Sequence, residues 1–224
     1  MDLNLSHPIR DSKDIDKFKQ KVERKIANMQ NSVDIDSIPL EALYEEYNSD
    51  QVPWRLKGVY EDIKNCGIMG GKGVVVHVGT SKDREVEKAL QNMKESLDYL
   101  LENNPESTPI LLETPAGEGE DLCSTIEEFA QFYNRFSARQ RKTLRICIDT
   151  CHVFAAGYDP LEYCKRWKTT FPDSLKLVHF NDSKGPRGCR VDRHEYPGLG
   201  YVGYDRLNEV KAWCVENSVD MVVE

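Results

Sequence analysis

The feature that most constrains the fold is an alternation of short apolar runs with longer amphipathic segments from residue 73 onward. Apolar residues recur at helical spacing over about 83–102 and about 124–136, and Ser124 with Glu127 predicts a capping box at the start of the second helix. We expect strands at 74–77, 109–113, 144–149, 176–179 and 221–224. Short strands that alternate with helices are typical of a parallel sheet, either open and doubly wound or closed as a (β/α) barrel.

Each expected strand ends in a side chain that can bind a metal ion: His77, Glu113, Asp149, His179 and Glu224. In a (β/α) barrel the carboxyl ends of all the strands meet on one face, where the active site lies. A polar residue that closes a single strand commonly only meets solvent. Because five strands in succession close with His, Asp or Glu, the pattern favours the barrel and a metal centre at that face.

Composition limits the class of protein. The chain has 224 residues, of which 39% are hydrophobic and 30% charged, so it can bury a core. The formal charge of −8 argues against a purely electrostatic nucleic-acid binder but leaves room for an enzyme with a local basic patch. The chain lacks an apolar run of the roughly 20 residues that a membrane span needs, and its start does not resemble a signal peptide. Seven unpatterned cysteines fit reduced thiols, so we expect an intracellular protein, cytoplasmic or nuclear.

The first part of the chain reads differently from the rest. Residues 14–30 predict a charged helix, residues 31–53 are polar with few core residues, and a second helix is expected to end near Lys64. We therefore divide the chain into an N-terminal helical or insert segment, 1–72, joined to the metal-binding part of a barrel, 73–224.

Three segments go beyond periodicity. They are LETPAGEG at 112–119, CIDTCHVFAAGYD at 147–159, and HFNDSK at 179–184 with GCRVDRH at 188–194. Together with His77-Val78-Gly79 they resemble, in order and separation, the signature segments of the endonuclease IV family of abasic-site DNA nucleases. The resemblance spans residues 73–224 and implies a TIM-type (β/α)8 barrel.

Family members bind three zinc ions, and the resemblance implies three sets of ligands here. His77 and Glu113 would serve the first ion, and His152, Asp192 and His194 the third. The second ion would be held by Glu113, Asp149, His179 and Glu224, so that Glu113 bridges two ions. Residue chemistry agrees, because mixed His and carboxylate ligands suit a catalytic zinc site, and Asp192 and His194 fall on one side of an extended segment. Cys147 and Cys151 are interpreted as packing residues.

The family reaction is hydrolysis of the phosphodiester 5′ to an abasic site in double-stranded DNA. Glu113 is the candidate to orient or deprotonate the attacking water. For DNA contact the sequence offers a loop with four cations beside the metal ligands: Lys184, Arg187, Arg190 and Arg193. An ordinary solvated basic loop is the alternative, and Arg193, between two ligands, can equally be structural.

The sequence also departs from the family. About five of the eight strands can be placed, so the barrel is expected to be incomplete, with its first strands and last helix missing. A further segment of chain or a partner would have to complete it. The first zinc set keeps only two ligands, too few for a tight site.

Two other functions stay open. One is an inactive or DNA-binding remnant that retains zinc, which only activity data would separate from a nuclease. The other is a metal-dependent sugar isomerase-like barrel, since related barrels also place His, Asp and Glu at strand ends. Against the isomerase stand His152 and the Asp192-Arg193-His194 motif with its glycine-rich continuation, 197–203.

Overall fold

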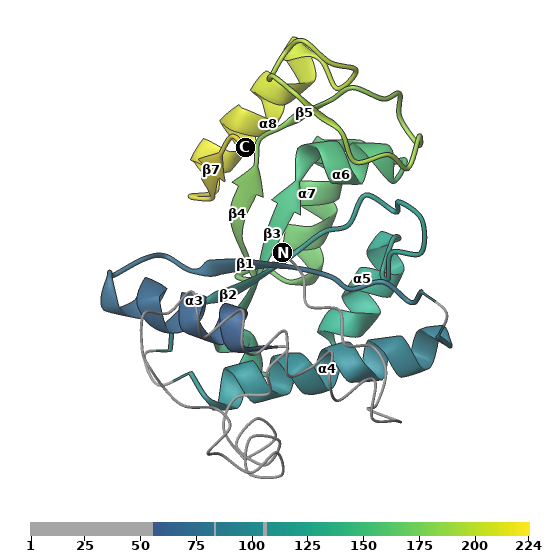
Figure 1. The fold of residues 1–224 in the computed structure, drawn as a ribbon. Helices are drawn as coiled ribbons and strands as arrows, with labels where there is room; N and C mark the ends of the chain where they lie inside the picture. Colours follow the sequence, from purple (N-terminus) through teal and green to yellow (C-terminus); the bar gives the residue numbers. More distant parts are fainter. Residues whose placement is uncertain (1–55, 83, 105–106) are drawn as a thin grey trace, which may run out of the picture. The chain divides into compact units, whose positions relative to one another are not determined.

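The computed structural model describes residues 56–224 except 83, 105 and 106 (Figure 1). The helix expected over 14–30 and the polar stretch 31–53 lie outside the described residues, and the boundary at residue 72 stays a prediction. The helix expected to end near Lys64 is α3 (Lys57–Ile68), which runs one turn further and contacts the first strand.

The centre of the described part is a parallel sheet whose strand order is β1-β2-β3-β4-β7. Its strands are β1 (Val74–His77), β2 (Ile110–Glu113), β3 (Leu144–Asp149), β4 (Leu175–His179) and β7 (Asp220–Val222). The five expected strands are therefore confirmed, with boundaries shifted by a residue or two. In the part of the chain that the structure describes, this sheet is open rather than closed into a barrel.

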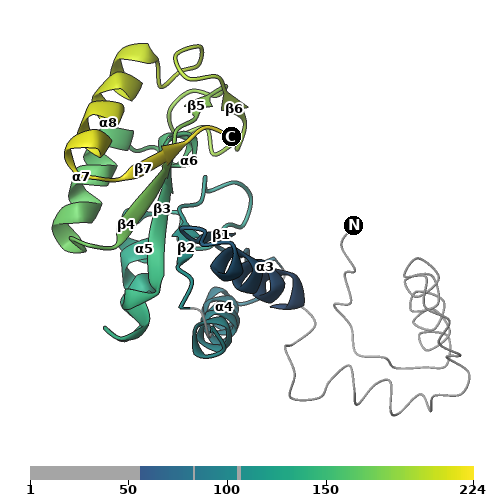
Figure 2. The same cartoon turned by 90° about the vertical axis from the view of Figure 1, so that its left-hand side faces the viewer.

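The helices follow the strands in the alternation that the sequence predicts. They are α4 (Val86–Glu102), α5 (Ile126–Tyr133), the 3-10 turn η3 (Gln140–Lys142), α6 (Thr150–Ala155), α7 (Pro160–Thr170) and α8 (Tyr204–Glu216). Figure 2 shows α7 and α8 side by side along one face of β4 and β7. Parallel strand–helix–strand units leave the carboxyl ends of the strands free for a site.

The core lies between the sheet and these helices. Ile110, Ile146 and Val178 are fully buried on neighbouring strands. A group of buried aromatic residues on α5 and α7 forms another part of the core. In that group the Phe129 and Trp167 rings lie 5.2 Å apart, a contact that adds to the burial of apolar area. The polar ends of buried rings are satisfied, since Trp167 donates a hydrogen bond from Nε1 to Ser174 Oγ at 2.8 Å.

Two expectations about element ends are wrong. The capping box of α5 is formed by Thr125 and Glu128, one residue later than predicted, because the Ser124 hydroxyl instead donates a hydrogen bond to the Asp121 carbonyl. The last strand ends at Val222, so Glu224 lies two residues beyond it rather than at its end.

A feature that the periodicity did not predict is a small antiparallel hairpin formed by β5 (Asp182–Ser183) and β6 (His194–Glu195). It lies near the carboxyl end of β4, as both views show (Figures 1 and 2). Among the described residues, no helix is long and apolar enough to cross a membrane.

Candidate metal centre

The strand register places the predicted residues at one edge of the sheet. His77 pairs with Glu113, and Glu113 pairs with Cys147. Two residues beyond Cys147 on β3, Asp149 pairs with His179. Parallel strands in this register carry these side chains toward the same face. The four predicted residues that close β1 to β4 are thus brought together by the sheet itself.

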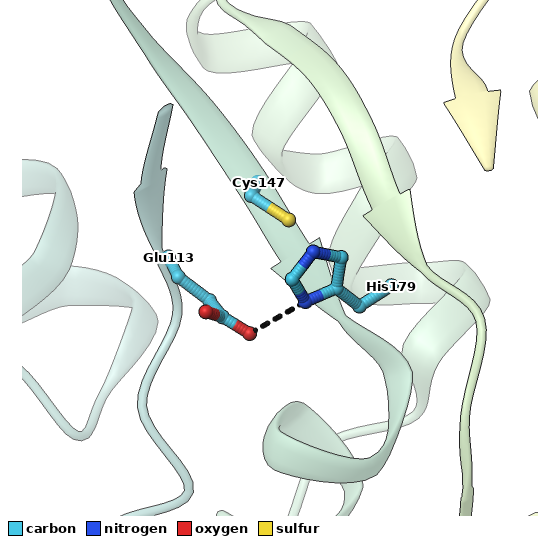
Figure 3. Close-up of side chains that lie close together, drawn as sticks. All are labelled: Glu113, Cys147 and His179. Carbon is cyan, nitrogen blue, oxygen red and sulfur yellow. Dashed lines mark hydrogen bonds and ion pairs between the residues drawn. The ribbon is translucent and has the colours of Figure 1, made fainter. Parts of the chain in front are cut away.

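Glu113 is the centre of the arrangement. Its carboxylate is fully buried, and His179 Nδ1 lies 2.9 Å from Oε1 in the interaction drawn in Figure 3. His77 Nε2 lies 3.0 Å from the other oxygen, Oε2, and His152 Nδ1 lies 3.5 Å from Oε1. Despite these neighbours, Oε2 is a buried oxygen that no group in the described residues hydrogen-bonds. A buried carboxylate oxygen in that position is one that a cation would satisfy.

Four predicted ligands form one cluster around His179. Donor atoms of Glu113, Asp149, His179 and Glu224 all lie within 4.8 Å of one another. His179 Nδ1 is 3.0 Å from Glu224 Oε2 and 3.8 Å from Asp149 Oδ2. One nitrogen surrounded by three carboxylates is a donor set of the kind that holds a divalent ion.

Three other predicted ligands form a second cluster, in which donor atoms of His152, Asp192 and His194 lie within the same 4.8 Å limit. Asp192 Oδ1 is 3.2 Å from both His152 Nε2 and His194 Nε2. The antiparallel hairpin of β5 and β6 brings His194 to this position. Two imidazoles and one carboxylate leave a fourth position open, as catalytic zinc sites do.

His152 is oriented by its backbone surroundings. Asp149 caps α6, and its Oδ1 accepts a hydrogen bond from the His152 N–H at 2.9 Å. His152 Nδ1 lies 2.8 Å from the Thr114 carbonyl oxygen, which leaves Nε2 for the second cluster. A backbone carbonyl at the other ring nitrogen is the usual way to fix the tautomer of a histidine ligand.

Asn181 is a site residue that the sequence reasoning missed. It is buried, its Nδ2 donates to Asp149 Oδ2 at 2.7 Å, and its Oδ1 accepts from the Glu224 N–H at 3.0 Å. The side chain therefore joins a carboxylate at the end of β3 to the segment after β7. The signal was present, because Asn181 follows His179 by two residues and continues the face of β4.

His77 differs from the other predicted ligands. Its side chain is 69% exposed, and Glu113 is the carboxylate it meets among the described residues. In the first predicted ligand set, the structure thus brings two side chains together. In the second set it brings four together, and in the third set three.

Cys147 and Cys151 are buried, as the packing interpretation expects, but both also approach the clusters. Cys147 lies between Glu113 and His179 (Figure 3), and Cys151 approaches Asp149 and His194. Burial raises the pKa of the Cys147 thiol, and burial with the Asp149 charge raises that of Cys151 to about 12. Both are therefore neutral thiols near pH 7.

Mutual charge interactions set the protonation of the clusters. Burial raises the pKa of Glu113, but the hydrogen bond from His179 and the neighbouring imidazoles outweigh it, so the net pKa is lowered. Burial lowers the pKa of His152, yet the carboxylates of Asp192, Asp149 and Glu113 raise it to about 10. Burial raises the pKa of Asp149. Such mutually perturbed groups at one edge of a sheet are typical of a functional site.

The four predicted DNA-contacting cations, Lys184, Arg187, Arg190 and Arg193, are all exposed, between β5 and β6. Arg187 Nε donates a hydrogen bond to the Gly157 carbonyl at 2.7 Å, and the Arg190 N–H donates to Ala155 O at 2.9 Å. The loop is therefore fastened to the end of α6, beside His152.

Comparison with known proteins identifies the family. A family model described as a xylose isomerase-like TIM barrel matches residues 5–210, and the chain belongs to this family. Within it, the chain resembles endonuclease IV. It is 37% identical over 154 residues, 66% of the chain, to a protein named probable endonuclease 4 from Oceanobacillus iheyensis.

Solved structures agree on the fold. Endonuclease IV from Thermus thermophilus matches 79% of this chain and 64% of its own, with a TM-score of 0.62 and 27% identity. The protein IOLI, solved with a bound zinc atom, matches with a TM-score of 0.56 at 22% identity over 75% of this chain and 59% of its own, which shows the fold alone. The match to the Oceanobacillus relative covers 51% of that protein, so the chain spans about half the length of the curated relatives. The predicted fold class is confirmed.

Proposed function

We propose that the protein is a zinc-dependent endonuclease that hydrolyses the phosphodiester on the 5′ side of an abasic site in double-stranded DNA. The observation that carries the proposal is the meeting of two clusters, four and three ligands each, at one edge of the sheet. The relatives named endonuclease 4 support this reaction class over other reactions of the fold.

The donor chemistry fits zinc. We assign His77 and Glu113 to one ion, and His152, Asp192 and His194 to another. The remaining ion would be held by Glu113, Asp149, His179 and Glu224. The buried Oε2 atom of Glu113, without a hydrogen bond among the described residues, supports Glu113 as the bridging ligand. When bound, zinc would supply Lewis-acid polarisation of the phosphodiester and a lowered pKa for the attacking water.

The protein's own side chains would orient the reaction. Glu113, whose pKa is lowered, is a carboxylate at neutral pH and can accept a proton from the attacking water. Asn181 would keep Asp149 and Glu224 in place through its two hydrogen bonds. The exposed cations Lys184, Arg187, Arg190 and Arg193 would bind phosphates and so hold the strand beside the clusters.

The test is metal content together with incision. The 224-residue chain is purified without chelator, its zinc is measured by elemental analysis, and it is incubated with a duplex that carries one abasic-site analogue. Two to three zinc ions per chain and cleavage on the 5′ side of the analogue are expected, with an undamaged duplex left intact. Zinc without incision would refute the nuclease and favour the zinc-retaining remnant. Interconversion of an aldose and a ketose in place of incision would favour the isomerase-like alternative.

A further inference from the structure

Large apolar side chains are exposed along one short segment, residues 196–204, which we call the aromatic turn. The relative exposures are 73% for Tyr196, 75% for Leu199, 63% for Tyr201 and 67% for Tyr204. Isolated exposed apolar residues are normal, but four within nine residues beside a polar site are a candidate for an interaction surface. Tyrosine rings are well suited to this because they offer area with little rotamer entropy.

The backbone of the aromatic turn is held by the buried carboxylate of Asp182. Its oxygens accept hydrogen bonds from the N–H groups of Gly198, Gly200 and Val202, at 3.0, 3.0 and 2.8 Å. A Cβ at Gly200 would lie 2.4 Å from the Ser183 carbonyl oxygen, so the turn is fitted closely against β5. The exposed side chains therefore project from a preorganised backbone, which lowers the entropy cost of binding a partner.

The aromatic turn lies next to the second cluster. It begins directly after β6, whose His194 belongs to that cluster, and the Tyr201 N–H donates to Ser183 O on β5 at 2.8 Å. At the loop end of the hairpin, the Lys184 N–H donates to Arg193 O at 2.9 Å. One hairpin thus carries metal-ligating residues, the basic loop and the aromatic turn.

The charge of this region favours a polyanion as the partner. Residues 184–204 contain four cations and two carboxylates, Asp192 and Glu195, whereas the whole chain has a net charge of −8. One of the two carboxylates, Asp192, lies in the second cluster. An apolar surface flanked by guanidinium groups matches nucleic acid, which presents phosphates next to sugars, and base faces where an abasic site interrupts the stack.

We infer that Tyr196, Leu199 and Tyr201 contact DNA beside the scissile phosphate, with their side chains against sugars and bases while the neighbouring cations bind phosphates. This inference rests on the proposed nuclease function and names part of its DNA-binding surface. Contacts of rings with bases are tolerant of sequence, which suits an enzyme that must find a lesion in any context. Tyr204 supports the turn, since a Cβ at Gly198 would come within 3.1 Å of its ring.

The salt dependence of binding separates the two kinds of contact. The affinity of the full chain for a fluorescent duplex with one abasic-site analogue is measured by anisotropy at several salt concentrations. Tyr196→Ala and Tyr201→Ala are each expected to weaken binding about tenfold at every salt concentration and to leave the slope against log salt unchanged. Lys184→Ala is expected to reduce that slope by about one. Tyr196→Phe and Tyr201→Phe should restore affinity, because they keep the ring.

Val215→Ala is the matched control, since Val215 is 66% exposed at the far end of α8 from the aromatic turn. Unchanged affinity in the tyrosine variants, while the unaltered chain binds and incises the lesion, would overturn this inference and leave the nuclease proposal standing. A change of oligomeric state in those variants, with DNA affinity intact, would also overturn it and assign the turn to self-association. An unaltered chain that does not prefer the lesion duplex would overturn the nuclease proposal.

Discussion

The Nε2 atoms of His152 and His194 lie 3.3 Å apart, although 42 positions separate the two residues in the chain. Two imidazole nitrogens at this distance, with Asp192 Oδ1 at 3.2 Å from each, need either a shared proton or a cation between them.

Loss of one second-cluster ligand should remove one ion and spare the other cluster. His194→Ala is expected to lower the zinc content by one ion per chain, because two ligands are too few for a tight site. Elemental analysis after dialysis measures this, with circular dichroism as a check on the fold. Zinc content equal to that of the unaltered chain would contradict the assignment of His194.

Glu113→Gln should lower the rate of incision more than the other substitutions do. The amide keeps the size of the side chain but cannot accept the proton, and general-base catalysis contributes roughly 10²- to 10⁴-fold. Single-turnover incision rates measure the effect, and Glu87→Gln, on the exposed N-terminal end of α4, is the matched control. A rate within tenfold of the unaltered chain would exclude Glu113 as the base.

Asn181→Ala should weaken metal binding without removing a ligand. Its loss frees Asp149 and Glu224 to move, and removal of such supporting hydrogen bonds costs about 10- to 100-fold in metal affinity. Competition with a chromogenic chelator measures this. The exposed Asn208 on α8 gives the control variant, Asn208→Ala, for which no change is expected.

Metal binding at the second cluster should release a proton. In the metal-free chain the pKa of His152 is raised to about 10, so the imidazole is protonated at pH 7, whereas a zinc ligand must be neutral. Affinity should therefore fall as the pH is lowered through the range below 10. Titration calorimetry in buffers of different ionisation enthalpy counts the protons. His152→Asn should release about one fewer, and equal release from both chains would refute the prediction.

Asp182→Ala should destabilise the hairpin strongly. The carboxylate accepts hydrogen bonds from five backbone N–H groups, those of Ser183, Gly198, Gly200, Val202 and Gly203. Removing a buried acceptor leaves donors unsatisfied, at a cost of about 1–3 kcal/mol each where water cannot replace it. Urea unfolding should show a clearly lowered free energy of unfolding, while Asp62→Ala on the exposed side of α3 should show little change.

The periodicity of the chain predicted the sheet well, because a parallel strand buried on both faces reads as a short apolar run. It also predicted the groups that meet, since the residue that closes each parallel strand arrives at the same edge. His77, Glu113, Asp149 and His179 needed no further information. Glu224 was placed at a strand end but lies beyond it, because β7 ends at Val222.

Other parts of the site depend on tertiary contacts that periodicity does not encode. The hairpin of β5 and β6 has two-residue strands, too short for an alternation signal. The role of Asn181 depends on the neighbouring positions of Asp149 and Glu224. The capping box shifted by one residue because Ser124 and Thr125 are both competent caps, and the local turn at Asp121 decides between them.

Because backbone N–H groups bind Asp182, the shape of the aromatic turn does not depend on which side chains it carries. Backbone groups hold the turn, so substitution of Leu199 or Tyr201 would leave its path intact, while proline at 198, 200, 202 or 203 would remove a donor. Gly200 is fixed by the close approach of Ser183. Natural variation or directed evolution can therefore change the exposed side chains of the turn, and with them the ligand that it binds, without disturbing the neighbouring histidines.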